Sequence, residues 1–112
     1  MSLEKLSDRE REIVLQSLNA ILRGGFLKGE FHTRLGIERE ELERVVSAYP
    51  DLDDMNHGSK VSLAINNCLN EVCQGVSFSS DQWARWFEVD RSEVKDVYRK
   101  WRILGGYSDP EI

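Results

Sequence analysis

The chain contains little cysteine or histidine, and this shortage limits the chemistry that it can perform. Of its 112 residues, two are cysteine and two are histidine. Cys68 and Cys73 are five positions apart in a predicted helix, which is too far for a disulfide bond without distortion. Neither His32 nor His57 stands at a metal-ligand spacing from the cysteines. We therefore expect two buried free thiols and no metal site.

Long hydrophobic runs are also absent. No apolar stretch approaches the length of a membrane span, and the segment 1–12 is too charged for a signal peptide. We therefore expect a cytoplasmic protein without membrane contact. Hydrophobic residues make up 40% of the chain and charged residues 31%, which is typical of one folded domain with a modest core.

The sequence lacks the short motifs that carry common reactions. It contains no glycine-rich phosphate loop, no nucleophile elbow and no paired-histidine motif. Its carboxylates fall on helix faces that we predict to be exposed, where nothing would shift their pKa for acid–base catalysis. We interpret His32 as a surface or boundary residue. We therefore expect no catalytic residue, no cofactor and no enzyme activity. An enzyme is the weakest of the possible functions, because no feature of the sequence supports it.

Six helices are predicted, which gives an all-α fold. Ser7 with Glu10, and Ser79 with Gln82, have the spacing of capping boxes at helix starts. Gly36 suits a tight turn, because a positive φ costs glycine little. The predicted helices cover residues 7–23, 28–35, 38–48, 60–74, 81–87 and 90–104.

The six helices divide into two similar halves. Residues 18–24 match residues 69–75 at an offset of 51, and selected core and capping positions from 26 to 49 match those from 78 to 101 at an offset of 52. One three-helix unit buries its apolar face poorly, whereas two packed units bury it well. We predict a single domain, 1–112, formed by a duplicated three-helix unit in a pseudo-two-fold bundle. Its parts are repeat 1 over about 7–50, a polar linker over 51–59, repeat 2 over about 60–104 and a loose C-terminal tail over 105–112.

Asparagines interrupt the apolar residues of both long helices. Asn19 and Asn70 occupy matching positions, and Asn66 and Asn67 lie beside the second. Amides in such helices usually bond to a neighbouring backbone group or to each other. We interpret these four as structural, with a ligand pocket as the alternative.

The net charge of −5 comes from one stretch of the chain. Residues 38–54 hold seven acidic residues against two arginines, whereas the rest of the chain is neutral, with thirteen of each sign. An acidic surface favours a basic partner and disfavours nucleic acid. The other interpretation is a solvated helix face that keeps the protein soluble.

The stretch 31–49 resembles a helix-turn-helix unit. It begins Phe-His-Thr-Arg-Leu-Gly-Ile, continues as a capped helix, and recurs over 83–101. In DNA-binding proteins with this unit, the first residues of the second helix contact bases in the major groove. In the first half these positions are mostly acidic, which DNA phosphates would repel: Glu38, Arg39, Glu40, Glu41 and Glu43. The second half resembles DNA-binding helix-turn-helix units more closely than the first half does. A helix-turn-helix regulator that uses helix 91–104 is therefore the alternative function.

The whole chain resembles small uncharacterised bacterial proteins with two such repeats, some of which resemble immunity proteins encoded beside toxins. The repeated Leu-Asn and Phe…Leu-Gly-Ile…Glu-Leu signatures carry the broader resemblance. It implies a non-catalytic module that neutralises a basic protein through an acidic surface. Trp86 matches Arg34 of the first half, and it is either an exposed binding residue or a filler of space left by asymmetric packing. The predicted partner-binding residues are Glu38, Glu40, Glu41, Glu43, Asp51, Asp53, Asp54 and Trp86, and the sequence predicts no oligomeric state.

Overall fold

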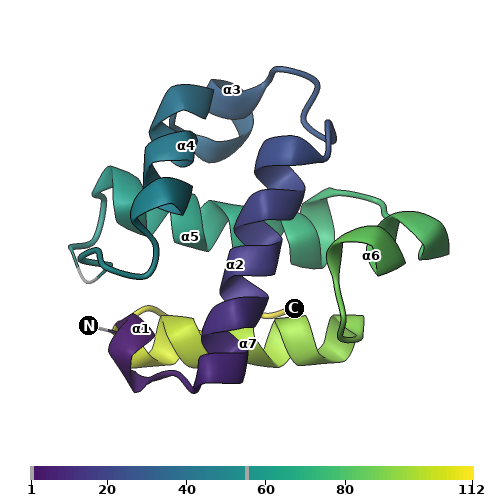
Figure 1. Cartoon of the computed structure of the whole chain (residues 1–112). Coiled ribbons are helices and arrows are strands. Elements are labelled where there is room, and N and C mark those ends of the chain that lie inside the picture. The colour runs from purple at the N-terminus through teal and green to yellow at the C-terminus, as the bar shows by residue number, and fades with distance from the viewer. Residues whose placement is uncertain (1, 55) are drawn as a thin grey trace.

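The computed structural model describes residues 2–54 and 56–112, and over these residues the fold is all-α, as predicted (Figure 1). All six predicted helices are present, and a short N-terminal helix and a π-helical turn are additional. Helix α3 is shorter than the predicted 28–35, because Lys28 and Gly29 adopt positive φ angles of 51° and 86°. The elements are α1 (Ser2–Lys5), α2 (Asp8–Arg23), α3 (Phe31–Leu35), α4 (Arg39–Ala48), α5 (Lys60–Asn70), η1 (Glu71–Gly75), α6 (Ser80–Trp86) and α7 (Arg91–Leu104).

Helix α2 is at the centre of the fold. It runs through the middle of the molecule in Figure 1 and contacts α4, α5, α6 and α7. The apolar residues on α2 cover too wide an arc for a surface stripe. Leu18 and Ile21, for example, are fully buried. The predicted central position of this helix is therefore confirmed.

Each short helix packs against the long helix of the other half. Helix α3 contacts α5, and α6 contacts α2. The medium helices α4 and α7 each contact both long helices. The duplication and the pseudo-two-fold arrangement of the two halves both stay predictions, which superposition of residues 14–49 on 65–101 would test.

Local signals set the helix starts as predicted. Ser7 Oγ accepts a hydrogen bond from Glu10 N at 3.1 Å, and Glu10 Oε1 accepts one from Ser7 N at 2.8 Å. Ser79 and Gln82 make the same exchange at 3.1 and 2.9 Å. Gly36 follows α3 with a φ of 74°. Both capping boxes and the glycine turn are therefore confirmed.

Helix α5 ends differently from the prediction of one helix over 60–74. The chain widens into η1, in which Val76 N donates to Glu71 O at 2.8 Å. The Glu71 side chain is buried and accepts two hydrogen bonds from Arg34 on α3, one of them from Nε at 2.9 Å. A Cβ atom at Gly75 would lie 2.1 Å from Glu71 Oε2, so glycine leaves room for this carboxylate. The pair joins the two halves of the chain.

The C-terminal segment 105–112, predicted to be loose, lies against α5 and α7. The Tyr107 ring stacks on Trp101 with 5.5 Å between ring centroids, and its hydroxyl contacts Ser62 Oγ. Arg102 Nε donates to Ser108 O at 2.8 Å. The prediction rested on the position of the segment at the chain end, after Gly105 and Gly106, whereas these contacts come from side chains on two helices.

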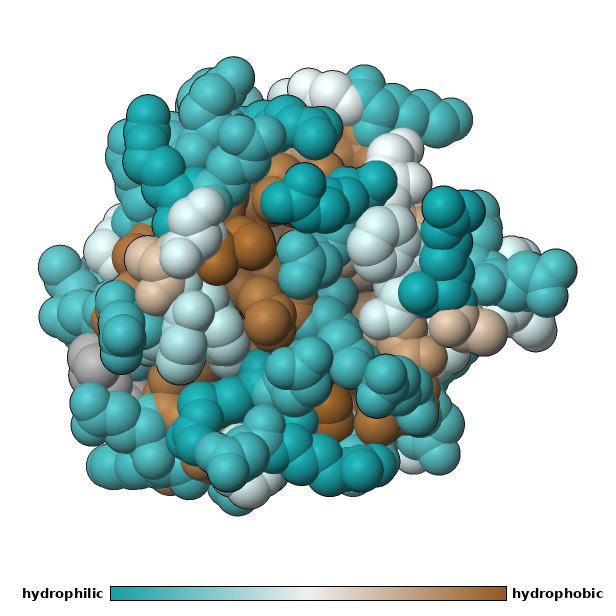
Figure 2. Space-filling view, in the orientation of Figure 1, coloured by the Kyte–Doolittle hydropathy of each residue, from teal (hydrophilic) through white to brown (hydrophobic). Residues whose placement is uncertain are grey.

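Figure 2 shows hydrophilic residues over most of one face, with hydrophobic side chains visible between α2 and α4. Among the described residues, Ile103 is the large hydrophobic side chain that is exposed to solvent. In the described part of the chain, no helix combines the length and the apolar character needed to cross a bilayer.

Candidate functional site

Five predicted partner-binding carboxylates are exposed around α4 and in the loop that follows it, and we call them the acidic face: Glu38, Glu40, Glu43, Asp51 and Asp53. Glu38 Oε1 lies 2.9 Å from Nδ1 of the exposed His32. Among the described residues, the side chains of Glu40 and Asp51 have no hydrogen-bond or ion-pair partner. Both carboxylates are therefore available to another molecule.

Glu41 does not belong to this face. Its carboxylate pairs with Lys60 Nζ, and its Oε1 accepts a hydrogen bond from Glu38 N at 3.2 Å. The hydrogen bond from Lys60, and then the one from the Glu38 backbone, lower the pKa of Glu41. The side chain is 14% exposed and links α4 to α5. Sequence reasoning missed this role because Lys60 lies in the other half of the chain, at no helical spacing from Glu41.

Asp54 is also removed from the predicted partner-binding set, because it is buried. Only 1% of the residue is exposed. Its Oδ2 accepts hydrogen bonds from Leu3 N at 3.1 Å and from Trp101 Nε1 at 2.8 Å. The carboxylate therefore holds the N-terminal helix α1 and helix α7 together. Because its donors come from the two ends of the chain, local sequence could not identify them.

Trp86 lies apart from the acidic face. It is the last residue of α6, which stands at the opposite side of Figure 1 from α4. The side chain is half-buried and packs against the core, in agreement with the space-filling interpretation. Its outer part lines a small hollow that contains no residue of the acidic face. Trp86 and the acidic residues therefore do not form one site.

The acidic face includes a shallow hollow of about 540 Å³, lined by Glu40, Glu43, Arg44, Ser47 and Ala48. Hydrophobic side chains reach the surface between α4 and α2 (Figure 2). Leu15 on α2 and Val46 on α4 are both half-buried. Apolar surface with a charged rim is the usual composition of a contact between proteins.

The basic side chains of α7 are mostly engaged within the molecule. Lys100 Nζ pairs with Glu10 at 2.8 Å, and Arg91 Nη2 donates to Phe78 O at 2.8 Å. Two further arginines of the helix, Arg99 and Arg102, bond to the C-terminal segment. Few cations of this helix are therefore free to contact DNA phosphates.

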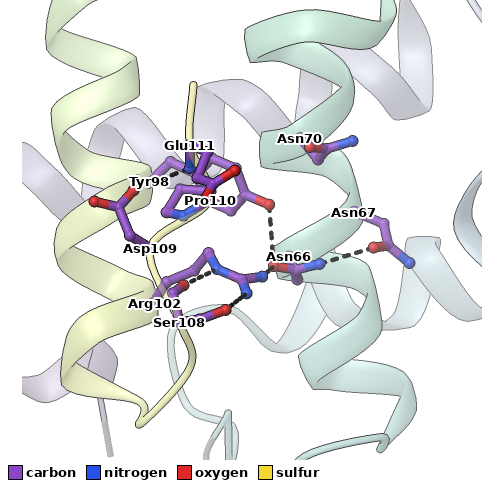
Figure 3. Close-up of a pocket in the computed structure, with 9 residues that line it drawn as sticks. All are labelled: Asn66, Asn67, Asn70, Tyr98, Arg102, Ser108, Asp109, Pro110 and Glu111. Carbon is purple, nitrogen blue, oxygen red and sulfur yellow. Dashed lines mark hydrogen bonds between the residues drawn. The ribbon is translucent and has the colours of Figure 1, made fainter.

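A hollow of about 630 Å³ lies between α5, α7 and the C-terminal segment (Figure 3). Asn66 Oδ1 accepts hydrogen bonds there from Tyr98 Oη at 3.1 Å and from Arg102 Nη1 at 2.6 Å. Asn66 Nδ2 donates to Asn67 Oδ1 at 2.9 Å, and Asn67 Nδ2 donates to Leu35 O at 2.8 Å. The structural interpretation of these two amides is confirmed, because they bond to each other and to the protein around them.

Both thiols are free, as predicted, although only Cys68 is fully buried and Cys73 is half-buried. Burial raises the pKa of both thiols, that of Cys73 to about 11. They are therefore protonated at neutral pH, whereas a nucleophile or metal ligand has to be a thiolate. Within residues 2–54 and 56–112, no group of three or more histidine, cysteine, aspartate or glutamate side chains is arranged to hold a metal ion.

Comparison with known proteins finds no relative of this chain. The chain matches no protein family, no curated protein and no solved structure. Function is therefore inferred from the geometry and charge of the surface.

Proposed function

We propose that the protein is a non-catalytic binding module whose acidic face binds a basic protein, in the manner of an immunity protein that neutralises a toxin. The observation that supports this most is the exposure of Glu40 and Asp51, neither of which has a hydrogen-bond or ion-pair partner among the described residues. The proposal includes a cytoplasmic location.

The charge distribution supports the proposal because it would raise the rate of association with a basic partner. Like charges close together on a helix and its loop repel one another. Glu40 and Asp51 have no partner among the described residues that would offset this repulsion. Toward a basic surface the same charges attract, and such steering raises association rates by about 10- to 1,000-fold at low salt. Helix α4 is held by α2 and α5, so it presents the charges from a fixed scaffold.

The alternative is DNA binding through α7, and the contacts of that helix make it the weaker candidate. Its basic residues are mostly bonded within the protein, and Asp90 and Glu93 stand at its start. Titration with mixed-sequence duplex at low salt tests this alternative, and we expect weak or no binding. Tight binding that falls steeply with added salt would favour the regulator.

Paired charge reversals test the proposed function directly. The variant Glu40→Lys with Asp51→Lys changes two exposed residues of the acidic face. A matched control, Asp96→Lys with Glu111→Lys, makes the same change in net charge at exposed positions outside the acidic face. The partner is captured from the source organism on the wild-type protein, and association rates are then measured across salt concentrations.

The proposal makes a different prediction for each variant. The acidic-face variant should associate at least about tenfold more slowly at low salt and lose most of its salt dependence. The control should keep most of the wild-type rate. Equal rates for both variants and the wild type would show that the acidic face serves only solubility.

A further inference from the structure

A second surface lies around α6, away from the acidic face. Two hollows of about 210 and 340 Å³ meet there and share three lining residues, Gly24, Phe26 and Gln82. Together they reach the size of small-molecule sites, about 300–1,000 Å³. We call this surface the α6 notch. The side chains that give it its character are basic or aromatic: Arg23, Lys28, Arg85 and Trp86.

The indole of Trp86 differs from the other two indoles in its hydrogen bonding. Trp83 Nε1 donates to Val89 O at 2.8 Å, and Trp101 Nε1 donates to Asp54 Oδ2 at 2.8 Å. In the described part of the chain, the Trp86 N–H has no hydrogen-bond partner, although the ring is half-buried. A half-buried tryptophan with a free N–H offers both a flat apolar surface and a donor.

The notch also collects unpaired cations. Of the ten arginines in the sequence, three make no hydrogen bond or ion pair with the described residues: Arg23, Arg44 and Arg85. Two of these three, Arg23 and Arg85, line the smaller hollow of the notch. Lys28 lines the larger hollow and also has no partner among the described residues. Arg34 lines it too, but its guanidinium is occupied by Glu71. The notch therefore holds three cations that form no salt bridge with the described residues.

We propose that the α6 notch binds a nucleoside monophosphate, with the base against Trp86 and the phosphate held by Arg23 and Arg85. Guanidinium groups bind phosphate through paired hydrogen bonds, and aromatic side chains bind bases by stacking. The free indole N–H adds one donor for an acceptor on the ligand. This site is independent of the proposed function, since it shares no residue with the acidic face.

The test is a titration of the ¹⁵N-labelled protein with AMP, followed through the three indole N–H signals in NMR spectra. The Trp86→Phe variant assigns the Trp86 signal by its disappearance. We expect this signal to move with AMP, and the signal of the buried Trp101 to stay in place and report an intact fold. Arg23→Ala and Arg85→Ala should each weaken AMP binding about tenfold or more, because each removes a charge-assisted bond. Arg44→Ala is the matched control and should change nothing.

Two ligand controls and one alternative role can overturn the proposal. Inorganic phosphate and adenosine should each bind much more weakly than AMP, and equal affinity for either one would refute two-part recognition. An unmoved Trp86 signal at millimolar AMP would refute the site. Arg23 and Arg85 also stand in the last turns of α2 and α6, where a cation offsets the helix dipole. If their alanine variants lower thermal stability but leave AMP affinity unchanged, that role is their function and the proposal is refuted.

Discussion

Replacement of Asp54 by alanine should destabilise the protein severely, although the residue belongs to an acidic surface stretch of the sequence. The carboxylate accepts hydrogen bonds from Leu3 N and Trp101 Nε1, and Asp54 and Trp101 are almost completely buried. A buried donor left without a partner costs about 1–3 kcal/mol. Two such donors give an expected loss of about 2–6 kcal/mol. This is a large part of the roughly 5–15 kcal/mol that stabilises a typical domain.

Urea denaturation followed by circular dichroism measures this loss. Asp54→Asn keeps an acceptor oxygen and should cost clearly less than Asp54→Ala. Asp51→Ala, at an exposed position in the same loop, should stay within about 0.5 kcal/mol of the wild type. Hydrogen exchange should also show earlier opening of α1 in Asp54→Ala, because the carboxylate holds this helix to α7. If Asp54→Ala and Asp51→Ala are equally stable, the buried hydrogen bonds do not contribute as argued.

Three further predictions concern single side chains. Gly75→Ala should destabilise the protein by about 1–2 kcal/mol in urea melts, because the new Cβ displaces the Glu71 carboxylate, and it should cost much less in a Glu71→Ala background. Burial raises the pKa of Tyr49 above its usual value of 10.0, so the unfolded chain loses this proton first and stability should fall as the pH rises above about 10. Tyr49→Phe should flatten that fall in urea melts at pH 9–11, and an unchanged slope would contradict the assignment. The Cys73 thiol, with its pKa raised to about 11, should react with Ellman's reagent at pH 8 far more slowly than glutathione, and comparable rates would show that the thiol is not shielded.

The sequence predicted those parts of the fold that depend on neighbours along the chain. The capping boxes at Ser7 and Ser79 and the turn at Gly36 each involve residues within one turn of the helix. Helix α1 could not be predicted from neighbouring residues, since four residues do not form a stable helix by themselves. It is held instead by tertiary contacts, with Leu3 and Leu6 buried in the core.

The candidate site could be predicted only as a region of charge. The sequence shows that carboxylates are concentrated between residues 38 and 54, and five of the seven are indeed exposed. It does not show which carboxylates find partners, because Lys60 and Trp101 reach Glu41 and Asp54 only after folding. The cost of desolvating a carboxylate depends on those partners, so composition alone could not separate the surface residues from the structural ones.

The packing of each short helix on the opposite long helix makes the two halves interlock. A nascent chain that has reached only the linker contains α3 but not α5, the helix against which α3 packs. In the same way, α6 packs against α2. Helix α2 is synthesised first, so this contact forms only after α6 has also been synthesised. Neither half can complete a core of its own, so native packing forms only when most of the chain has been synthesised. We therefore expect folding and unfolding to be cooperative across the whole chain, without two independently stable halves.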